Sequence, residues 1–306
     1  MAGSRGGSVR PAPRRAVLSV WGALLIGSAL LLSAPLRAAD PEYPVKGLVL
    51  KVDRISRTFL VSHERIHGFM DAMTMPFEVK SASELDGIVP GATVEFTLVV
   101  GRQAAYATGL RVRRYESAEQ DPSTARRLAL LKRAMGTAVT PLAVGQPVPD
   151  LPLIDQTGAP VRLSQFGGQV VALNFIYTRC ALPQFCLRIS NDFGVIQRRF
   201  RAVLGRDLTL VTVTFDPERD TPEVLARYAA RWKADPRTWR FLTGAVADVR
   251  RMCALFGVEF FPDEGLMNHS LHTVVLDRSG RVIANIEGNR HTPEQLGDLI
   301  QESLHR

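Results

Sequence analysis

Two stretches of this chain gather side chains that bind soft metal ions. The first is the run from His63 to Met75, which reads HERIHGFMDAMTM. The second combines Cys180 and Cys186 with a histidine far along the chain, His269. Thioether, thiolate and imidazole groups together select copper, above all Cu(I), whereas Mg²⁺ and Ca²⁺ need more carboxylates than either stretch offers. Copper handling is therefore the leading hypothesis from the residue types.

The Met-rich stretch places several candidate ligands close together. Met73 and Met75 are one residue apart, so both point to the same face if this segment is a strand, and Met70 lies in the preceding turn. His63, at the end of an earlier strand, could sit opposite them. A thioether binds Cu(I) without losing a proton and forms no disulfide, which suits an oxidising compartment. The alternative is that these methionines fill the core of a barrel.

The first of the three cysteines follows a strongly apolar segment, VVALNFIYT, where a strand is expected to pass into a helix. A helix N-terminus lowers a thiol pKa, so Cys180 is expected to favour the thiolate, ready to attack a disulfide or to bind metal. Five residues separate it from Cys186, a looser spacing than Cys-x-x-Cys. The pair could equally form a structural disulfide, and Cys253 is expected to be a small buried hydrophobe.

Composition and the N-terminus set the class of protein. The chain has 306 residues, of which 46% are hydrophobic and 22% charged, as in an ordinary globular protein with room for two domains. Arg5, Arg10, Arg14 and Arg15 precede an apolar run and a small-residue cleavage pattern that ends at Ala39. Residues 1–39 are therefore expected to be a secretory signal that directs the chain to the periplasm, with an uncleaved membrane anchor as the alternative.

The basic net charge does not indicate a nucleic-acid partner. The formal charge is +8, but five arginines lie before Asp40 with no acidic residue among them, which leaves +3 for the remainder. Such a small excess without a basic block gives little support to nucleic-acid binding. Contact with a membrane is expected only if the N-terminal segment stays uncleaved.

The rest of the chain divides into three parts. Residues 41–115 show short strand patterns separated by turn signals, typical of a small all-β barrel; the expected strands are 47–52, 58–62, 73–79, 93–100 and 106–112. Residues 116–143 are expected to be a linker with a short helix. Residues 144–306 alternate strand and helix patterns and close on a strand pair, which predicts an α/β domain of thioredoxin type.

Several motifs in the C-terminal part occur in the order found in one family. They are Asn174-Phe-Ile-Tyr-Thr-Arg-Cys180, the second cysteine followed by Leu187-Arg-Ile-Ser, the stretch Thr214-Phe-Asp-Pro-Glu-Arg-Asp-Thr-Pro-Glu223, and Asn268-His269-Ser270. With them the chain resembles the Sco/SenC family of copper proteins from about Val144 to Leu304. The resemblance implies that Cys180, Cys186 and His269 bind one copper ion.

This segment departs from the usual family pattern in ways that bear on the site. The commonest family motif spaces its cysteines Cys-x-x-x-Cys, and Asn268 stands where an aspartate is usual. His272 is a second nearby candidate ligand, but alternation along a strand from His269 would turn it to the opposite face. Asp220 or Thr221, followed by proline and glutamate, forms a helix-capping pattern, so a structural role is expected there before a partner contact.

The Met-rich segment has a family resemblance of its own. Met70-Asp-Ala-Met-Thr-Met-Pro-Phe77 is similar to the CusF-like periplasmic copper-binding domain, a small OB-like β-barrel, and the similarity covers about Tyr43 to Tyr115. The resemblance implies His63, Met73 and Met75 as copper ligands. A tryptophan caps the ion in that family; here Met70 occupies its place, as a further ligand or as a cover. His67 is expected to be solvated.

Together these patterns predict an exported copper chaperone rather than an enzyme. The barrel would acquire Cu(I), the thioredoxin-like domain would hold Cu(I) or Cu(II), and the family resemblance implies delivery to a copper centre of cytochrome c oxidase. One alternative is a thiol–disulfide reductase, with Cys180 as the attacking thiolate, Cys186 as the resolving one and a thiol reductant as partner. That activity has no use for His269 or for the Met-rich barrel. A copper-tolerance buffer without delivery is the other alternative.

Overall fold

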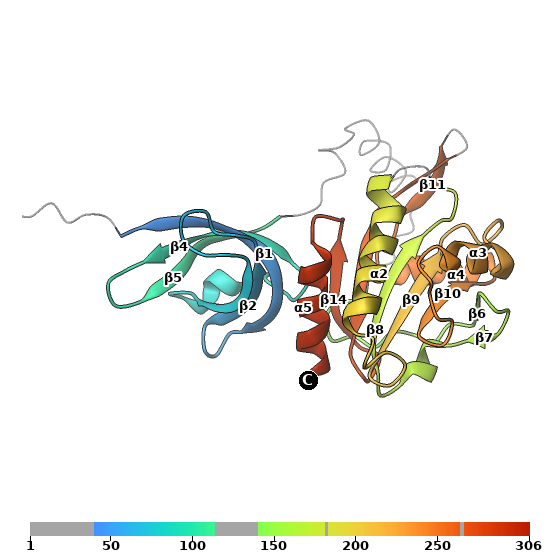
Figure 1. The fold of residues 1–306 in the computed structure, drawn as a ribbon. Helices are drawn as coiled ribbons and strands as arrows, with labels where there is room; N and C mark the ends of the chain where they lie inside the picture. Colours follow the sequence, from blue (N-terminus) through green and yellow to red (C-terminus); the bar gives the residue numbers. More distant parts are fainter. Residues whose placement is uncertain (1–39, 114–139, 181–182, 264–265) are drawn as a thin grey trace, which may run out of the picture. The chain divides into compact units, whose positions relative to one another are not determined.

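The computed structural model describes residues 40–113, 140–180, 183–263 and 266–306. The predicted signal segment, residues 1–39, lies outside the described residues. The same holds for residues 114–139, which contain most of the predicted linker and its short helix. Figure 1 shows the described parts, an antiparallel N-terminal sheet and a C-terminal part with helices and a second sheet.

Five antiparallel strands form the N-terminal sheet, in the order β3-β2-β1-β4-β5. The elements are β1 Glu42–Asp53, β2 Thr58–His63, β3 Met73–Glu78, the 3₁₀ turn η1 Ala82–Leu85, β4 Thr93–Val100 and β5 Ala105–Val112. A bridge between Val79, just beyond β3, and Ala107 of β5 joins the two edge strands, so the sheet closes as a small barrel. All five expected strands are present, which confirms the all-β prediction.

Alternation along these strands builds the barrel core. Residues two apart on a strand share a face, and the inward face is apolar. Phe59, Phe77 and Phe96 meet there with ring centroids 4.9 to 5.9 Å apart. The inward face of β2 and β3 thus runs from this aromatic cluster toward His63 and Met73 at the other end of the strand pair.

A seven-stranded mixed sheet forms the centre of the C-terminal part, in the order β14-β13-β8-β9-β10-β6-β7. Parallel pairing joins β8 to β9 and β9 to β10, while the other neighbours are antiparallel. The strands of this sheet are β6 Leu153–Asp155, β7 Pro160–Val161, β8 Val170–Ile176, β9 Leu208–Thr214, β10 Trp239–Thr243, β13 His272–Leu276 and β14 Val282–Glu287. The helical elements are η3 Leu163–Phe166, η4 Pro183–Leu187, α2 Arg188–Arg199, α3 Pro222–Ala230, α4 Val246–Leu255 and α5 Pro293–Leu304.

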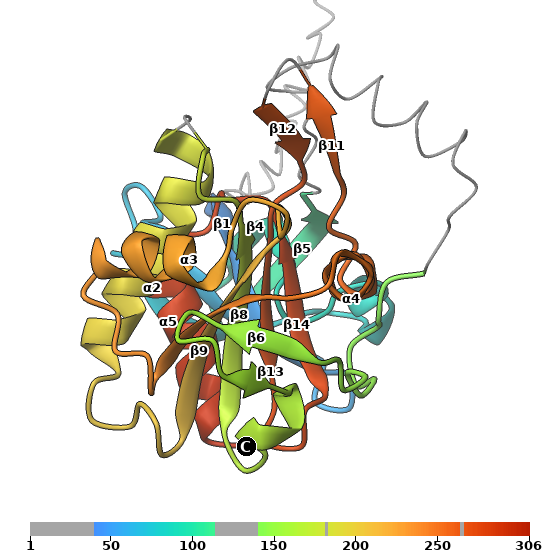
Figure 2. The same cartoon turned by 90° about the vertical axis from the view of Figure 1, so that its right-hand side faces the viewer.

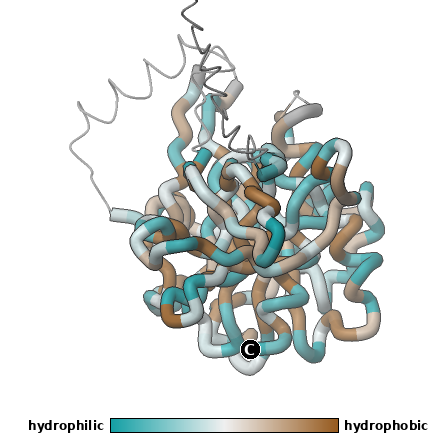
Figure 3. The backbone as a smooth tube through the Cα atoms, turned by 90° about the vertical axis from the view of Figure 1, so that its left-hand side faces the viewer, coloured by the Kyte–Doolittle hydropathy of each residue, from teal (hydrophilic) through white to brown (hydrophobic). Residues whose placement is uncertain are grey.

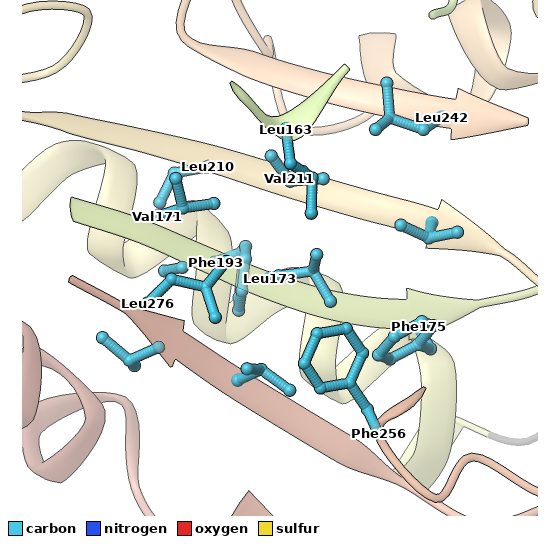
Figure 4. Close-up of a cluster of buried hydrophobic side chains, with 14 of the residues drawn as sticks. Leu163, Val171, Leu173, Phe175, Phe193, Leu210, Val211, Leu242, Phe256 and Leu276 are labelled. Carbon is cyan, nitrogen blue, oxygen red and sulfur yellow. The ribbon is translucent and has the colours of Figure 1, made fainter. Parts of the chain in front are cut away.

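Helices cover both faces of this sheet. Figure 2 shows α2, α3 and α5 on one face and α4 on the other. Accordingly, Phe193 of α2 packs on Trp239. Phe256, just after α4, packs on Phe175 (Figure 4). Strands β8 and β9 are buried along their whole length, as is typical of parallel strands covered on both faces. The prediction of a thioredoxin-like α/β fold is confirmed.

Two local features differ from the sequence expectation. A π-helical turn, η4, precedes α2, so the regular helix begins at Arg188 and not directly after Cys180. A separate hairpin, β11 Phe260–Asp263 and β12 Leu266–His269, forms its own two-stranded sheet (Figures 1 and 2). Its strands have only four residues each and include Pro262, so they lack the long apolar alternation by which strands are recognised.

Hydrophobic and hydrophilic residues alternate in short stretches along the described backbone (Figure 3). Among the residues that the structure describes, none of the helices combines the length and the apolar character needed to cross a membrane.

Candidate metal centres

Three soft ligands meet at one end of the C-terminal sheet. Cys180 lies in the turn after β8, Cys186 lies in η4, and His269 ends β12. One candidate ligand atom from each, the two Sγ atoms and a ring nitrogen of the histidine, all lie within 4.8 Å of one another. The His269 Nε2 is 3.7 Å from the Cys186 Sγ. Within the described ranges no other group of three or more His, Cys, Asp or Glu side chains is arranged to hold a metal ion.

A π-helical turn lies directly before α2 and contains Cys186. A π-turn holds one residue more than an α-turn, and such turns are frequent at functional sites. The irregular point is Phe185, whose φ and ψ are both −109°, directly before Cys186. Despite the five-residue spacing of the cysteines, their two sulfurs and the His269 ring nitrogen thus lie within 4.8 Å of one another.

The ring of His269 is held in one orientation. Its Nδ1 lies 2.9 Å from the backbone oxygen of Ser270, and because a carbonyl can only accept, Nδ1 carries the proton. This leaves the lone pair of Nε2 directed toward the cysteines, the usual arrangement of a metal-binding histidine. The rings of Tyr177, Phe185 and Phe215 surround the imidazole, with centroids 4.8 to 6.1 Å away.

The cysteines are reduced thiols in this structure, and their surroundings differ. Cys180 is half-buried and Cys186 is fully buried. Burial, followed by the neighbouring Cys180 thiol, raises the pKa of Cys186 well above its ordinary value. The regular helix α2 begins at Arg188, two residues after Cys186, so Cys180 does not stand directly at its N-terminus. Cys253 is buried away from the site, and burial raises its pKa too.

The second histidine near the site is engaged elsewhere. The Nδ1 of His272 lies 2.9 Å from the Oδ1 of Asn285 on the neighbouring strand β14. His272 stands on β13 and His269 on β12, so alternation along a single strand does not describe their relation.

Sequence reasoning also missed the three rings around His269. Two of them, Tyr177 and Phe215, lie inside the motifs that carry the family resemblance, which is the one signal that pointed to them.

In the barrel, strand register brings the candidate thioether and imidazole ligands together. His63 and Met73 are direct partners across β2 and β3, and Met75 pairs with Val61 two residues along. Directly paired residues and residues two apart share a face, so His63, Met73 and Met75 lie on one face. Met75 is half-buried, and Met73 is 54% exposed. These candidate ligands therefore lie together at the rim of the barrel.

His63 has the same orientation as His269. Its Nδ1 donates to the backbone oxygen of Glu64 at 2.7 Å, while its buried Nε2 has no hydrogen-bond partner among the described residues. An unpartnered buried polar atom costs about 1–3 kcal/mol, so a buried lone pair without a donor is unusual. A metal ion is the partner that this lone pair and the two thioethers fit.

Met70 and His67 lie in the turn before β3. Met70 pairs with Ile66 in a short bridge and is half-buried. It lines a cavity of about 330 Å³ together with Met75, Phe69 and Phe77. His67 is exposed. Met70 thus lies beside Met75, one of the candidate ligands, and His67 is open to solvent.

Two family models match the chain. Residues 145–305 match the SCO1/SenC model, and residues 42–111 match the model described as copper binding periplasmic protein CusF. A Stutzerimonas stutzeri protein with the provisional name of a copper-binding protein is 31% identical over 115 residues, 38% of this chain and 54% of its own length. Protein sco1 of Schizosaccharomyces pombe is 28% identical over 156 residues, 48% of this chain and 57% of its own length.

The solved structure of Arabidopsis thaliana ScoI with copper bound is similar to this chain with a TM-score of 0.46 and 23% identity, over 54% of this chain and 100% of that one. The chain spans a little over half the length of the two curated relatives above. From the match over residues 145–305, preceded by a CusF-like region, the chain belongs to the SCO1/SenC family.

Proposed function

We propose that this protein is an exported copper chaperone with two copper sites. In the barrel, His63, Met73 and Met75 bind Cu(I), with Met70 at the edge of the site. In the thioredoxin-like domain, Cys180, Cys186 and His269 bind copper. The observation that carries the proposal is the convergence of two thiols and one oriented imidazole within 4.8 Å, a ligand set that suits copper. Residues 41–115 and 144–306 are the proposed domains, joined by the linker 116–143.

The two sites differ in how copper exchanges with protons. The thioethers and the neutral imidazole of the barrel bind Cu(I) without proton release. Each thiol must lose a proton to become a ligand, and burial raises the pKa of Cys186, so copper entry there releases protons. Loading of the thiolate site therefore depends on pH more strongly than loading of the barrel. Two sites on one chain also raise the local copper concentration for transfer between them.

The proposed recipient is a copper-bearing subunit of cytochrome c oxidase, as the family resemblance implies, and the proposed location is the periplasm, in line with the CusF match. The test mixes the Cu-loaded protein with the reduced soluble domain of that subunit and follows the absorption of its copper centre. Cu-loaded wild type should fill the centre, and Cys180→Ser/Cys186→Ser should not. If the wild type keeps its copper while free Cu(I) fills the same recipient, the protein is a buffer without delivery.

The close approach of the two sulfurs also supports a second candidate function, a thiol–disulfide reductase. The Cys180 thiolate would attack a recipient disulfide and release one recipient thiolate. Cys186 would then displace the second, which leaves a Cys180–Cys186 disulfide and two recipient thiols, and an external dithiol would restore the pair. The test is reduction of the oxidised recipient domain under copper-free conditions. His269→Ala should leave this reaction intact while it abolishes tight copper binding, so the two activities are separable.

A further inference from the structure

Asp220 is a fully buried carboxylate in the loop before α3. The sequence pattern offers it or Thr221 as the cap of that helix. In the structure the cap is Thr221, whose Oγ1 accepts from the backbone N–H of Val224 at 3.4 Å. Capping therefore does not explain why an acidic side chain is buried at position 220.

Three donors from two neighbouring segments surround this carboxylate. The backbone N–H of Thr178 donates to its Oδ2 at 3.1 Å, and the Thr178 hydroxyl donates to Oδ1 at 2.5 Å. The hydroxyl of Thr214, at the end of β9, donates to Oδ2 at 2.5 Å and accepts the backbone N–H of Asp216 at 3.0 Å. Asp220 thus joins the ends of β8 and β9 to the start of α3.

The segment that it holds leads directly to the first thiol ligand. Thr178 and Arg179 are the residues between Tyr177 and Cys180, and each is tied down. Thr178 is bound by Asp220, and the Arg179 guanidinium pairs with Asp216 at 2.9 Å. The backbone N–H of Cys180 reaches the carbonyl of Tyr177 at 3.3 Å to close the turn. The backbone that carries Cys180 is therefore anchored to the core rather than to the rest of the site.

Burying a carboxylate disfavours its charge, and a buried charge is retained only where donors compensate it. Burial raises the pKa of Asp220, while the bonds from Thr178 and Thr214 act in the opposite direction. A neutral side chain of similar size would avoid this cost. The buried carboxylate is therefore expected where accurate placement of the Thr178–Cys180 turn matters more than the stability that it costs.

We propose that Asp220 is a positioning residue of the copper site, which holds Thr178 so that the Cys180 sulfur is presented to Cys186 and His269 before copper arrives. The inference rests on the proposed function, since it presumes that these three side chains bind copper. Preorganisation of this kind strengthens binding because less freedom is lost when the ion enters.

The test uses Thr178→Val in the full chain and a matched control at a second buried aspartate. Asp155 is also fully buried, and Thr157 binds its Oδ1 through both the hydroxyl, at 2.6 Å, and the backbone N–H, at 2.9 Å. Thr157→Val therefore removes the same kind of hydroxyl bond in the same domain, away from the copper ligands. Asp220→Asn and Asp155→Asn form a second pair, with the same readouts, in case either valine variant fails to fold.

The readouts are the thiolate-to-Cu(II) charge-transfer absorption, which the thioethers of the barrel cannot produce, Cu(I) affinity against a competing chelator, and the melting temperature. Thr178→Val should weaken copper binding about tenfold and alter the absorption band, the low end of the loss seen when a group that orients a metal ligand is removed. Thr157→Val should lower the melting temperature similarly and leave copper binding unchanged. Equal copper binding in both variants, or equal loss in both, would overturn the role of Asp220. A wild type without the absorption band would instead refute the thiolate site itself.

Discussion

At the scale of residues, the two proposed sites share one device. In His63 and in His269 the Nδ1–H group donates a hydrogen bond to the backbone carbonyl of the following residue, at 2.7 and 2.9 Å. The Nε2 atom of each ring is left for another partner. Residue types and motif order predicted these histidines, both cysteines and the methionines. They did not predict that Phe185 lies beside His269 or that Asp220 binds Thr178. Both contacts depend on which distant segments the fold brings together.

Met73 allows a test of ligation separate from packing. Because its side chain is 54% exposed, Met73→Leu should change the free energy of unfolding by less than about 0.5 kcal/mol. The lost thioether should still lower the Cu(I) affinity of the barrel by about tenfold or more, measured against a competing chelator. Met252→Leu, at a buried position in α4, is the control that keeps Cu(I) affinity. Unchanged affinity in Met73→Leu would mean that this methionine is not a ligand.

At the scale of elements, long or strongly patterned strands and helices were predictable, and short irregular ones were not. The five barrel strands and β8 lie where apolar patterns placed them. The hairpin β11–β12 and the π-turn η4 were missed, although they carry His269 and Cys186. Both are short pieces whose geometry is set by contacts with the rest of the domain, such as the stacking of Phe260 on Phe215 at 5.3 Å.

The base of the hairpin offers an element-level prediction. The Ser270 hydroxyl accepts the backbone N–H of Glu259 at 2.9 Å and donates to the Gly257 carbonyl at 3.4 Å. Ser270→Ala should lower the free energy of unfolding by about 1 kcal/mol. It should also speed copper release several-fold, because His269 directly precedes Ser270 and its hairpin would be held less firmly.

The control for this hairpin is Ser279→Ala, in the turn between β13 and β14. The Ser279 hydroxyl binds Asp277 at 2.7 Å and lies away from the copper ligands. Stopped-flow transfer of copper to a chelator measures the release rate. Equal rates for Ser270→Ala and the control would show that the base of the hairpin does not govern release.

At the scale of the whole molecule, buried titratable groups beyond the copper sites shape stability. Burial raises the pKa of Asp192 in α2 to about 6, with Arg188 lowering it and Glu294 raising it. Burial, with Arg188 beside it, lowers the pKa of His291 to about 4. One oxygen of Asp192 and the Nδ1 of His291 are buried without hydrogen-bond partners among the described residues.

These two groups act on stability with opposite signs. Between pH 4 and 6.5 the unfolded chain binds a proton at His291 that the folded chain does not, so this contribution makes stability rise with pH. Between its ordinary value and pH 6, Asp192 binds a proton only in the folded chain, so its contribution falls as pH rises. The two partly cancel in the folded wild type.

In Asp192→Asn, the pH-dependent contribution of His291 to stability should remain without the opposing contribution of Asp192. The free energy of unfolding of the variant, from urea titrations between pH 4 and 7, should rise with pH more steeply than that of the wild type, by up to about 3 kcal/mol. The double variant Asp192→Asn/His291→Gln should lose this extra slope. Parallel curves for the wild type and Asp192→Asn would contradict the assignment.

Copper stoichiometry shows whether one chain holds two independent copper sites. The reduced chain without residues 1–39 is titrated with Cu(I) under anaerobic conditions, as wild type, as Met73→Leu/Met75→Leu and as Cys180→Ser/Cys186→Ser. Two tightly bound coppers are expected in the wild type and one in each double variant. A single copper that is lost only with the methionines would contradict the two-site proposal and leave the cysteines as redox groups.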